Sequence, residues 1–451
     1  MRPNTRLAAA LLAFTVSVAL AGCSGESSGT ASGPVTINYA LWDDLQQPAY
    51  QQCANAFTKA NPNIKVKITQ TAWDQYWTNL TTQLASGDAP DVFTDEVGYY
   101  PVFAKNNQIM DLAPRIAADK IDLSQYQAGL ADRWLKDGKR YGLPKDWDTV
   151  AIVYNKDLAR AAGFDAASLA NLTWNPNDGG TFEKFIAKST IDVHGKNGLD
   201  PDFDKKHVKV HGIELTYEDG SVGQNGFGDL AASDGFHYLD KNPFGTKYKF
   251  DDPALSATIT WMASLAAKGY AAPFDKASTL GTDAILNAGR SAMTMTGSWT
   301  INTYLGATAR QHFAFAPLPV GPEGRKTIMG GLSDAIFAGT QHPDQAWQWV
   351  KYLASPACQD VVAGKKVVFP AIKSSSEKAL AAQTAAGHDV KAFSQEATEP
   401  GDTVLAPITD HGDQVTQEVQ SALESVWLGQ DDAASALTKA QKQVDSIMAQ
   451  P

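Results

Sequence analysis

Residues 35–68 read VTINYALWDDLQQPAYQQCANAFTKANPNIKVKI, and this stretch decides the fold class. Val35–Leu41 is apolar-rich and typical of a strand, and Pro48–Lys59 has a helical pattern that Asn61-Pro62 would end. Ile64–Ile68 alternates apolar and lysine residues, as a half-buried strand does. Because parallel neighbours need a crossover connection, this order of strand, helix and strand indicates an α/β protein with a mainly parallel sheet covered on both faces.

The alternation continues beyond this stretch. Trp73–Leu84 has a helical pattern, Asp91–Phe93 is a short strand, and Thr149–Tyr154 is apolar enough to be a buried strand. Residues 171–250 are rich in Gly, Asn, Asp and Pro with broken periodicity, which indicates an elaborated second domain with long loops. Helical patterns return in three later segments: Pro253–Lys268, Asp344–Leu353 and Gln414–Met448.

The N-terminus has the pattern of a lipoprotein export signal. Arg2 and Arg6 precede the apolar run Leu7–Leu20, which is short for a membrane span, and Leu20-Ala-Gly-Cys23 follows. We expect residues 1–22 to be removed as a signal peptide, Cys23 to carry the lipid, and the Gly/Ser-rich residues 23–34 to form a flexible tether. The alternative is a plain secretory signal with an incidental cysteine. Both kinds of signal predict an extracytoplasmic protein, and the lipoprotein signal also predicts that the protein is anchored to the cell membrane.

The charge of the chain limits its partners. The 451 residues carry a formal net charge of −11, and no run of Lys and Arg stands out. This balance argues against nucleic acid as a partner and against a polybasic contact with anionic lipid. The acyl group on Cys23 is therefore the only membrane attachment that the sequence predicts.

Three cysteines are present, and if Cys23 is lipidated the other two form an even pair. In an oxidising compartment a disulfide between Cys53 and Cys358 is the natural interpretation, and two buried free thiols are the alternative. The bridge predicts that early and late parts of the chain share a domain.

Several of the eleven tryptophans fall where a strand is expected to end, next to polar side chains. Trp42 precedes Asp43, Trp147 precedes Asp148, and Trp299 follows a serine. A pyranose has an apolar face that packs on an indole and a rim of hydroxyls that bond to carboxylates, so this combination favours a sugar site at the carboxyl ends of strands. Taken singly, each tryptophan is better interpreted as an ordinary core aromatic residue, and it is the combination with polar neighbours that favours a sugar site.

Six segments carry a resemblance to a known family. They are Leu20-Ala-Gly-Cys23; Gly87-Asp-Ala-Pro-Asp-Val-Phe93; Tyr141-Gly-Leu-Pro144 with Thr149-Val-Ala-Ile-Val-Tyr-Asn-Lys-Asp-Leu158; Asn287-Ala-Gly-Arg-Ser-Ala-Met-Thr-Met-Thr-Gly-Ser-Trp299; Gly330-Gly-Leu-Ser333; and His342-Pro-Asp-Gln-Ala-Trp-Gln-Trp-Val-Lys-Tyr-Leu353. In this order the chain resembles the extracytoplasmic solute-binding proteins of carbohydrate ABC importers, the family 1 group that includes maltose-binding protein. An insertion from Trp174 to Asp204 departs from the shortest members.

The resemblance implies a two-lobe periplasmic-binding-protein fold of type II, in which a ligand cleft lies between lobes joined by hinge crossings. By this analogy residues 35–148 and 334–366 form lobe 1, and residues 149–333 and 367–451 form lobe 2. Cys53 and Cys358 then fall in the same lobe.

The resemblance also implies site residues. Asp95, Glu96 and Tyr99 lie on the sugar-contacting loop of the first lobe, Asp148 at the first crossing, and Trp299 stacks on sugar from the second lobe. Gly331, Ser333 and Asp334 lie at the second crossing. Further expected lining residues are Trp42, Asp43, Trp147, Gln224, Asn225 and His411.

The expected function is that of a binding receptor: a monomer that captures a sugar, an oligosaccharide in particular, by hinge closure and delivers it to a membrane permease. No enzyme activity and no cofactor are implied. One alternative is the same fold binding glycerol phosphate, a polyamine or a metal chelate, although the expected cleft segments lack the Arg that a phosphate would favour. A secreted glycoside hydrolase is the other, and no hydrolase signature is present.

No metal site is predicted. Asp192–Asp204 is rich in oxygen ligands suited to calcium but lacks EF-hand spacing, so a solvated acidic loop is the favoured interpretation. The eight histidines show no zinc-binding spacing.

Overall fold

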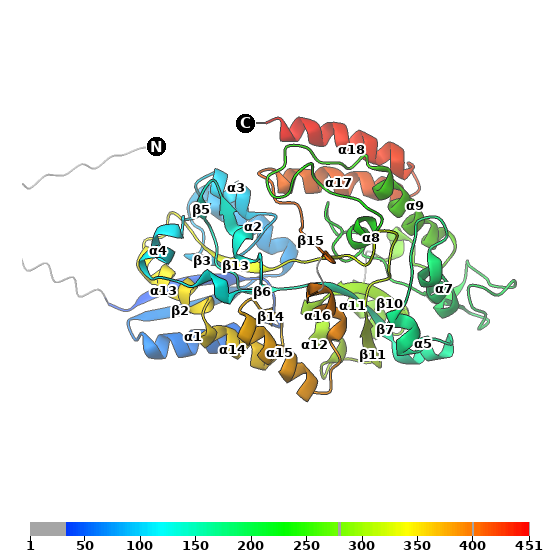
Figure 1. Cartoon of the computed structure of the whole chain (residues 1–451), viewed down its shortest axis with the longest axis horizontal. Helices are drawn as coiled ribbons and strands as arrows, with labels where there is room; N and C mark the ends of the chain where they lie inside the picture. Colours follow the sequence, from blue (N-terminus) through cyan, green and yellow to red (C-terminus); the bar gives the residue numbers. More distant parts are fainter. Residues whose placement is uncertain (1–32, 278–280, 399–400, 451) are drawn as a thin grey trace, which may run out of the picture. The chain divides into compact units, whose positions relative to one another are not determined.

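The computed structural model describes residues 33–277, 281–398 and 401–450. The expected signal peptide, Cys23 and most of the expected tether lie outside the described residues. Figure 1 shows the arrangement of the elements.

The first sheet has the strand order β13-β3-β1-β2 and contains the strands predicted near the N-terminus. They are β1 (Val35–Leu41), β2 (Ile64–Gln70) and β3 (Val92–Glu96), joined through α1 (Gln47–Ala60) and α2 (Trp73–Ser86). β1 pairs in parallel with both β2 and β3, which confirms the α/β prediction for this sheet. The fourth strand, β13 (Leu332–Ile336), returns from far along the sequence and pairs antiparallel with β3.

Local chemistry explains where these helices begin and end. A proline stands in the first turn of α1, where its missing N–H costs no hydrogen bond, and Asn61 closes the helix by donating its backbone N–H to the Phe57 carbonyl. Gly87 ends α2 in the left-handed conformation, with φ of 83°. In α1 the buried positions Tyr50, Cys53, Ala54 and Phe57 recur at helical spacing and face the sheet.

The second sheet has the order β10-β7-β11, from β10 (Met293–Gly297), β7 (Val150–Asn155) and β11 (Phe313–Ala316). Every residue of β7 is buried, so the predicted buried strand is confirmed. Both of its pairings are antiparallel, so the expectation of mainly parallel pairing is wrong for this sheet. An apolar run shows that both faces are covered but carries no information on strand direction.

Each sheet has its own hydrophobic core. The core at the second sheet includes side chains from α7 (Gly180–Ser189), α9 (Pro253–Ala267), α17 (Gly412–Trp427) and α18 (Ala433–Met448). The core at the first sheet includes side chains from α13 (Pro343–Leu353) and α14 (Pro356–Lys365). The helical patterns predicted in these regions are confirmed.

Cys53 of α1 and Cys358 of α14 form a disulfide, with Cα atoms 5.3 Å apart and a sequence separation of 305. The predicted pairing is present in the structure. Both cysteines are buried in the core of the first sheet.

Residues 367–393 also pack in the core of the first sheet. They include β14 (Phe369–Pro370), which pairs with β6 (Asp146–Trp147), and α15 (Lys373–Ala385). We therefore propose that the first lobe continues past residue 366 to the end of α15.

The remaining elements are short. They are α3 (Tyr100–Lys105), α4 (Ala113–Ala118), β4 (Leu135–Lys136), β5 (Lys139–Arg140), α5 (Lys156–Ala161), α6 (Ala166–Ala170), β8 (Ile191–Asp192), β9 (Val208–Val210), α8 (Phe227–Ser233), α10 (Phe274–Ala277), α11 (Thr282–Asn287), α12 (Ile301–Leu305), β12 (Thr327–Ile328), α16 (Lys391–Thr398) and β15 (Thr403–Val404). Among the described residues, no helix has the length and apolar character needed to cross a membrane.

Candidate ligand-binding site

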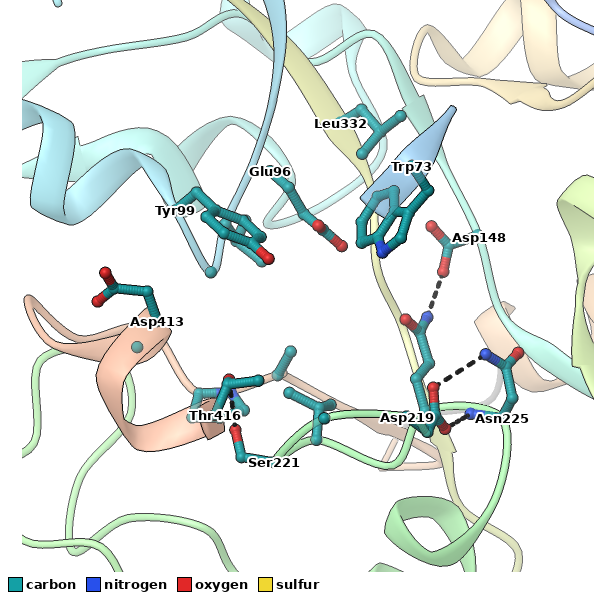
Figure 2. Close-up of a pocket in the computed structure, with 18 of the residues that line it drawn as sticks. Trp73, Glu96, Tyr99, Asp148, Asp219, Ser221, Asn225, Leu332, Asp413 and Thr416 are labelled. Carbon is teal, nitrogen blue, oxygen red and sulfur yellow. Dashed lines mark hydrogen bonds between the residues drawn. The ribbon is translucent and has the colours of Figure 1, made fainter. Parts of the chain in front are cut away.

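A cavity of about 640 Å³ lies where the ends of β1 and β3 meet loops from the second half of the chain. Figure 2 shows Glu96 and Tyr99 on one side and Asp219, Ser221, Asn225 and Thr416 on the other. In α/β proteins ligands bind beyond the carboxyl ends of strands, and the cavity occupies that place at β1 and β3.

The loop after β1 is held by its own aspartate. Asp43 accepts hydrogen bonds from the backbone N–H groups of Leu45 and Gln46, at 2.8 and 3.1 Å, and from the Gln46 side chain at 2.6 Å. These bonds fix the turn that presents Trp42 and Asp43 to the cavity. Burial raises the pKa of the Asp43 carboxyl.

Two neighbouring carboxylates at the end of β3 were both expected in the site, but only one of them lines the cavity. Glu96 lines the cavity, whereas Asp95 is 0 % exposed and accepts a hydrogen bond from the Glu96 backbone N–H at 2.8 Å. Successive side chains of a strand point to opposite faces, so only one of the two can reach the ligand side.

Six aromatic residues line the cavity: Trp42, Trp73, Tyr99, Trp147, Tyr248 and Trp299. Tyr99 stacks on Trp77 with ring centroids 3.7 Å apart, and Trp42 meets Trp73 edge to face at 5.0 Å. Trp73 is 43 % exposed, which leaves an aromatic face available to a ligand.

The segment that leads into β7 brings polar groups from distant parts of the sequence together. Asp148 accepts hydrogen bonds from the Gly330 backbone N–H at 3.1 Å and from the Gln224 side chain at 2.6 Å. Asn225 donates from its backbone and side chain to Asp219, as Figure 2 shows. The expected residues Asp148, Gln224 and Asn225 therefore meet in one lining.

Trp299 reaches the cavity through the local geometry of the Gly-Ser-Trp motif. It lies in a short 3₁₀ turn directly after β10, and its ring folds back over Gly297. A side chain at position 297 would collide with that ring, so glycine is needed there.

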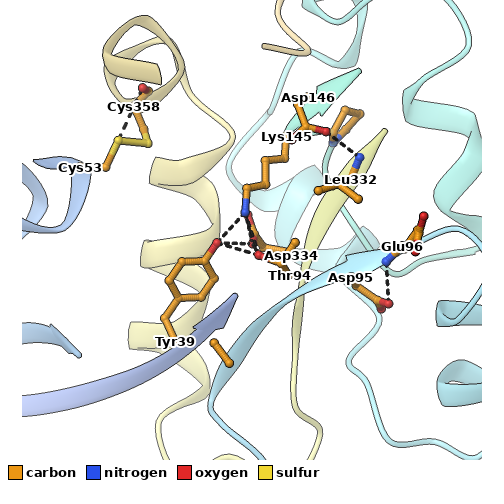
Figure 3. A network of polar contacts seen from close by, with 12 residues as sticks. Tyr39, Cys53, Thr94, Asp95, Glu96, Lys145, Asp146, Leu332, Asp334 and Cys358 are labelled. Atoms are coloured by element: carbon orange, nitrogen blue, oxygen red, sulfur yellow. Dashed lines mark hydrogen bonds and ion pairs between the residues drawn. A yellow bond between two sulfur atoms is a disulfide. The ribbon is translucent and has the colours of Figure 1, made fainter. Parts of the chain in front are cut away.

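Four further expected residues do not line the cavity. Asp334 is buried in an ion pair with Lys145, as Figure 3 shows, and Ser333 is buried against Gly142. Gly331, with φ of 152°, packs closely against the Asp146 carbonyl. His411 is buried directly before α17. Like Asp95, these residues are absent from the cavity lining. In β13 it is Leu332, next to Ser333, that lines the cavity.

Sequence reasoning missed Trp73, Asp146 and Tyr248, and it also missed two larger groups of lining residues. One is the loop Thr216–Val222, and the other is the face of α17 that carries Asp413, Thr416, Gln417, Gln420 and Glu424. The α17 group recurs at helical spacing, so a polar stripe on one face of that helix could have indicated it. Nothing in the loop residues distinguishes them from other solvated turns.

The lining is strongly acidic. It contains eight carboxylates and, among the described residues, no Lys, Arg or His: Asp43, Glu96, Asp146, Asp148, Glu218, Asp219, Asp413 and Glu424. Burial, with repulsion from Asp148 and Asp146, raises the pKa of Glu96 to about 8. Burial raises the pKa of Asp146 to about 7 and that of Asp148 to about 6. No group of side chains in the described part of the chain has the arrangement of a metal site.

These pKa values predict how the stability of the unliganded protein depends on pH. The pKa of Glu96 rises from 4.5 to about 8 on folding, so between these pH values the folded state binds more protons than the unfolded state. Stability therefore falls as pH rises through this window. We expect Glu96→Gln to lose stability less steeply than the unmodified protein between about pH 5 and about pH 8, measured by chemical denaturation. Parallel curves for the two proteins would contradict this.

A cavity lined by strand ends and loops, with aromatic and carboxylate side chains together, defines a ligand-binding α/β protein. The sequence matches the model of the bacterial extracellular solute-binding protein family over residues 52–392, and the chain belongs to that family.

Curated relatives are distant in sequence. The chain is 26 % identical to the arabinooligosaccharide-binding protein of Bacillus subtilis (strain 168) over 212 residues, which are 42 % of this chain, and spans only about half of that protein, 48 %. It is 24 % identical to the maltodextrin-binding protein MdxE of the same organism over 359 residues, 77 % of this chain and 76 % of MdxE.

Solved structures share the fold over nearly the whole chain. The ABC substrate-binding protein Lmo0181 from Listeria monocytogenes, in complex with cycloalternan, has a TM-score of 0.79 at 21 % identity, covering 92 % of this chain and 99 % of that one. The GacH receptor of Streptomyces glaucescens GLA.O has a TM-score of 0.75 at 20 % identity, covering 92 % and 98 %. These likenesses confirm the two-lobe solute-binding fold.

Proposed function

We propose that the protein is the carbohydrate receptor of an ABC importer, and that its ligand is an oligosaccharide. The observation that carries this proposal is the lining itself, in which six aromatic residues lie beside carboxylates and amides. Aromatic faces pack on the apolar C–H faces of sugar rings, and the polar groups bond to the hydroxyls.

The relatives support the same class of ligand. The arabinooligosaccharide-, maltodextrin- and galactooligosaccharide-binding proteins of Bacillus subtilis are all named for oligosaccharides. A volume of about 640 Å³ lies within the range of ordinary small-molecule sites. The proposed role is binding without catalysis.

Capture by hinge closure fits the chain path between the two sheets. Beyond α15 the chain returns to the core of the second sheet, where α17 packs. Two earlier segments connect the strands of the two sheets: one runs through β6 into β7, and the other runs from β12 to β13. They lie side by side, since the Val150 backbone N–H donates to Thr327 at 2.9 Å and the Gly330 N–H to Asp148. Adjacent crossings of this kind allow one half to rotate against the other around a bound ligand. Delivery to permease subunits would follow closure.

A ligand screen tests the proposed function. Thermal shifts would be measured against neutral and amine-bearing mono- and oligosaccharides, with glycerol phosphate and spermidine as non-sugar arms. A ligand at a hundred times its Kd adds about 2.7 kcal/mol of stability, so a true ligand gives a clear shift. We expect at least one oligosaccharide to bind without being cleaved. Stabilisation by a non-sugar arm alone, or release of smaller sugars, would overturn the proposal.

We also propose that Cys23 carries a lipid anchor that keeps the receptor beside its permease. The support is the order of charged, apolar and small residues that ends in Leu20-Ala-Gly-Cys23. Cys23→Ala is expected to leave ligand affinity unchanged and to remove the protein from the membrane fraction of expressing cells. Retention of the variant in that fraction would contradict the anchor.

A further inference from the structure

The cavity combines many negative charges with no positive charge of its own. Of the eight lining carboxylates, Asp146 is the most deeply placed, at 3 % exposed. One of its oxygens accepts the Leu332 backbone N–H at 2.9 Å, and the other, Oδ2, has no hydrogen-bond partner. A buried carboxylate oxygen without a partner on the wall of a cavity lacks the donor that would compensate its burial.

Two cations lie behind this wall, and each is engaged elsewhere. The Lys145 ammonium donates to Tyr39, Thr94 and Asp334, as Figure 3 shows. The Arg133 guanidinium donates to the carbonyls of Met329 and Gly330 at 2.7 and 3.0 Å. Both influence the nearby carboxylates electrostatically, but neither belongs to the cavity lining. Among the described residues, the lining therefore contains no cation that compensates its carboxylates.

We infer that the ligand is an oligosaccharide bearing at least one protonated amine, which lies beside Glu96, Asp146 and Asp148. This inference rests on the proposed function and narrows it from sugars in general to amino sugars. The ammonium group compensates the negative charge of the lining and reduces the repulsion among the three carboxylates. The aromatic lining favours a sugar over an open-chain polyamine, because a polyamine has no ring face to stack on Trp42 or Trp299.

The raised pKa values of the lining carboxyls predict that binding of a cationic ligand is coupled to proton release. In the unliganded cavity Glu96, with its pKa near 8, is mostly protonated at neutral pH. A bound cation favours the ionised carboxylate, so binding of an amino sugar releases protons. A neutral sugar would instead use the protonated carboxyl groups as hydrogen-bond donors and would release few protons.

The experiment compares ligands that differ only in charge. Calorimetry would use β-1,4-linked oligosaccharides of glucose, of N-acetylglucosamine and of glucosamine, and for any other sugar found in the screen its aminated and unmodified forms. We expect the aminated form to bind at least about tenfold tighter at low salt, with the preference reduced as salt increases. Buffers of different ionisation enthalpy would show proton release for that form alone.

Variants locate the effect. Glu96→Gln keeps the shape of the side chain and is expected to remove most of the preference for the amine, while the neutral form still binds. Asp344→Asn, at a 75 % exposed carboxylate paired with Arg115 outside the lining, is the matched control and should keep the preference. Neutral sugars binding as tightly as their aminated forms would overturn this inference and leave the proposed function standing. Absence of binding by every sugar would overturn the proposed function itself.

Discussion

Replacing Lys145 with alanine is expected to lower the free energy of unfolding by about 3–5 kcal/mol. Lys145 and Asp334 are each 3 % exposed, and their charged atoms lie 3.2 Å apart. The ammonium also donates to the hydroxyls of Tyr39 and Thr94 at 2.6 and 2.8 Å and lies 4.0 Å from the centre of the Tyr50 ring. Its removal leaves the Asp334 carboxylate buried without a compensating charge.

An exposed ion pair provides the control. Lys351 and Asp119 are 2.7 Å apart but 40 % and 33 % exposed, so Lys351→Ala should cost less than about 1 kcal/mol. Urea unfolding of both variants measures the difference, with the m-value showing whether unfolding stays two-state. Equal losses from the two substitutions would show that the buried network does not hold β1, β3 and β13 together.

Replacing Trp299 with alanine is expected to weaken ligand binding by about 2 kcal/mol or more, a factor of about 30 in Kd. The indole lines the cavity and is partly buried against the core of the first sheet, although it follows β10 of the second sheet. It therefore offers a preorganised face, whose loss removes both stacking area and the exclusion of water.

The matched control for this substitution is Trp427→Ala. Trp427 is partly buried against the core of the second sheet and does not line the cavity, so this variant should lose stability while its Kd stays unchanged. Calorimetry with the tightest-binding oligosaccharide from the screen would compare both variants. An unchanged Kd for Trp299→Ala would remove the residue from the site.

Local periodicity predicts the elements well and their long-range pairing poorly. The strands β1, β2 and β7 were predictable, because alternation and apolar runs are written in consecutive residues. The antiparallel return of β13 to β3 depends on residues some 240 positions apart, and no local pattern encodes it. The helical tail is two helices, since Gly429 adopts a φ of 67° and Asp432 caps α18.

The site shows the same division. Tryptophans and carboxylates at strand ends led to Trp42, Glu96 and Trp299, because strand ends meet at one edge of a sheet. The choice between Asp95 and Glu96, or between Ser333 and Leu332, depends on which strand face is turned to the cavity. Only the pairing register supplies that information. The polar face of α17 depends on how a C-terminal helix packs, which sequence alone does not give.

The first sheet has a consequence for how the protein crosses a membrane. The sheet begins with β1 at Val35, but its edge strand β13 is synthesised some 300 residues later. Cys358, the disulfide partner of Cys53 in α1, is synthesised after β13. The N-terminal segment therefore cannot complete its sheet until Leu332–Ile336 has been synthesised, or its bridge until Cys358 has been synthesised. Until then the N-terminal segment cannot form its complete sheet, and an unfolded chain can pass through a translocation pore. We infer that this discontinuous order delays folding until the polypeptide has reached the oxidising side.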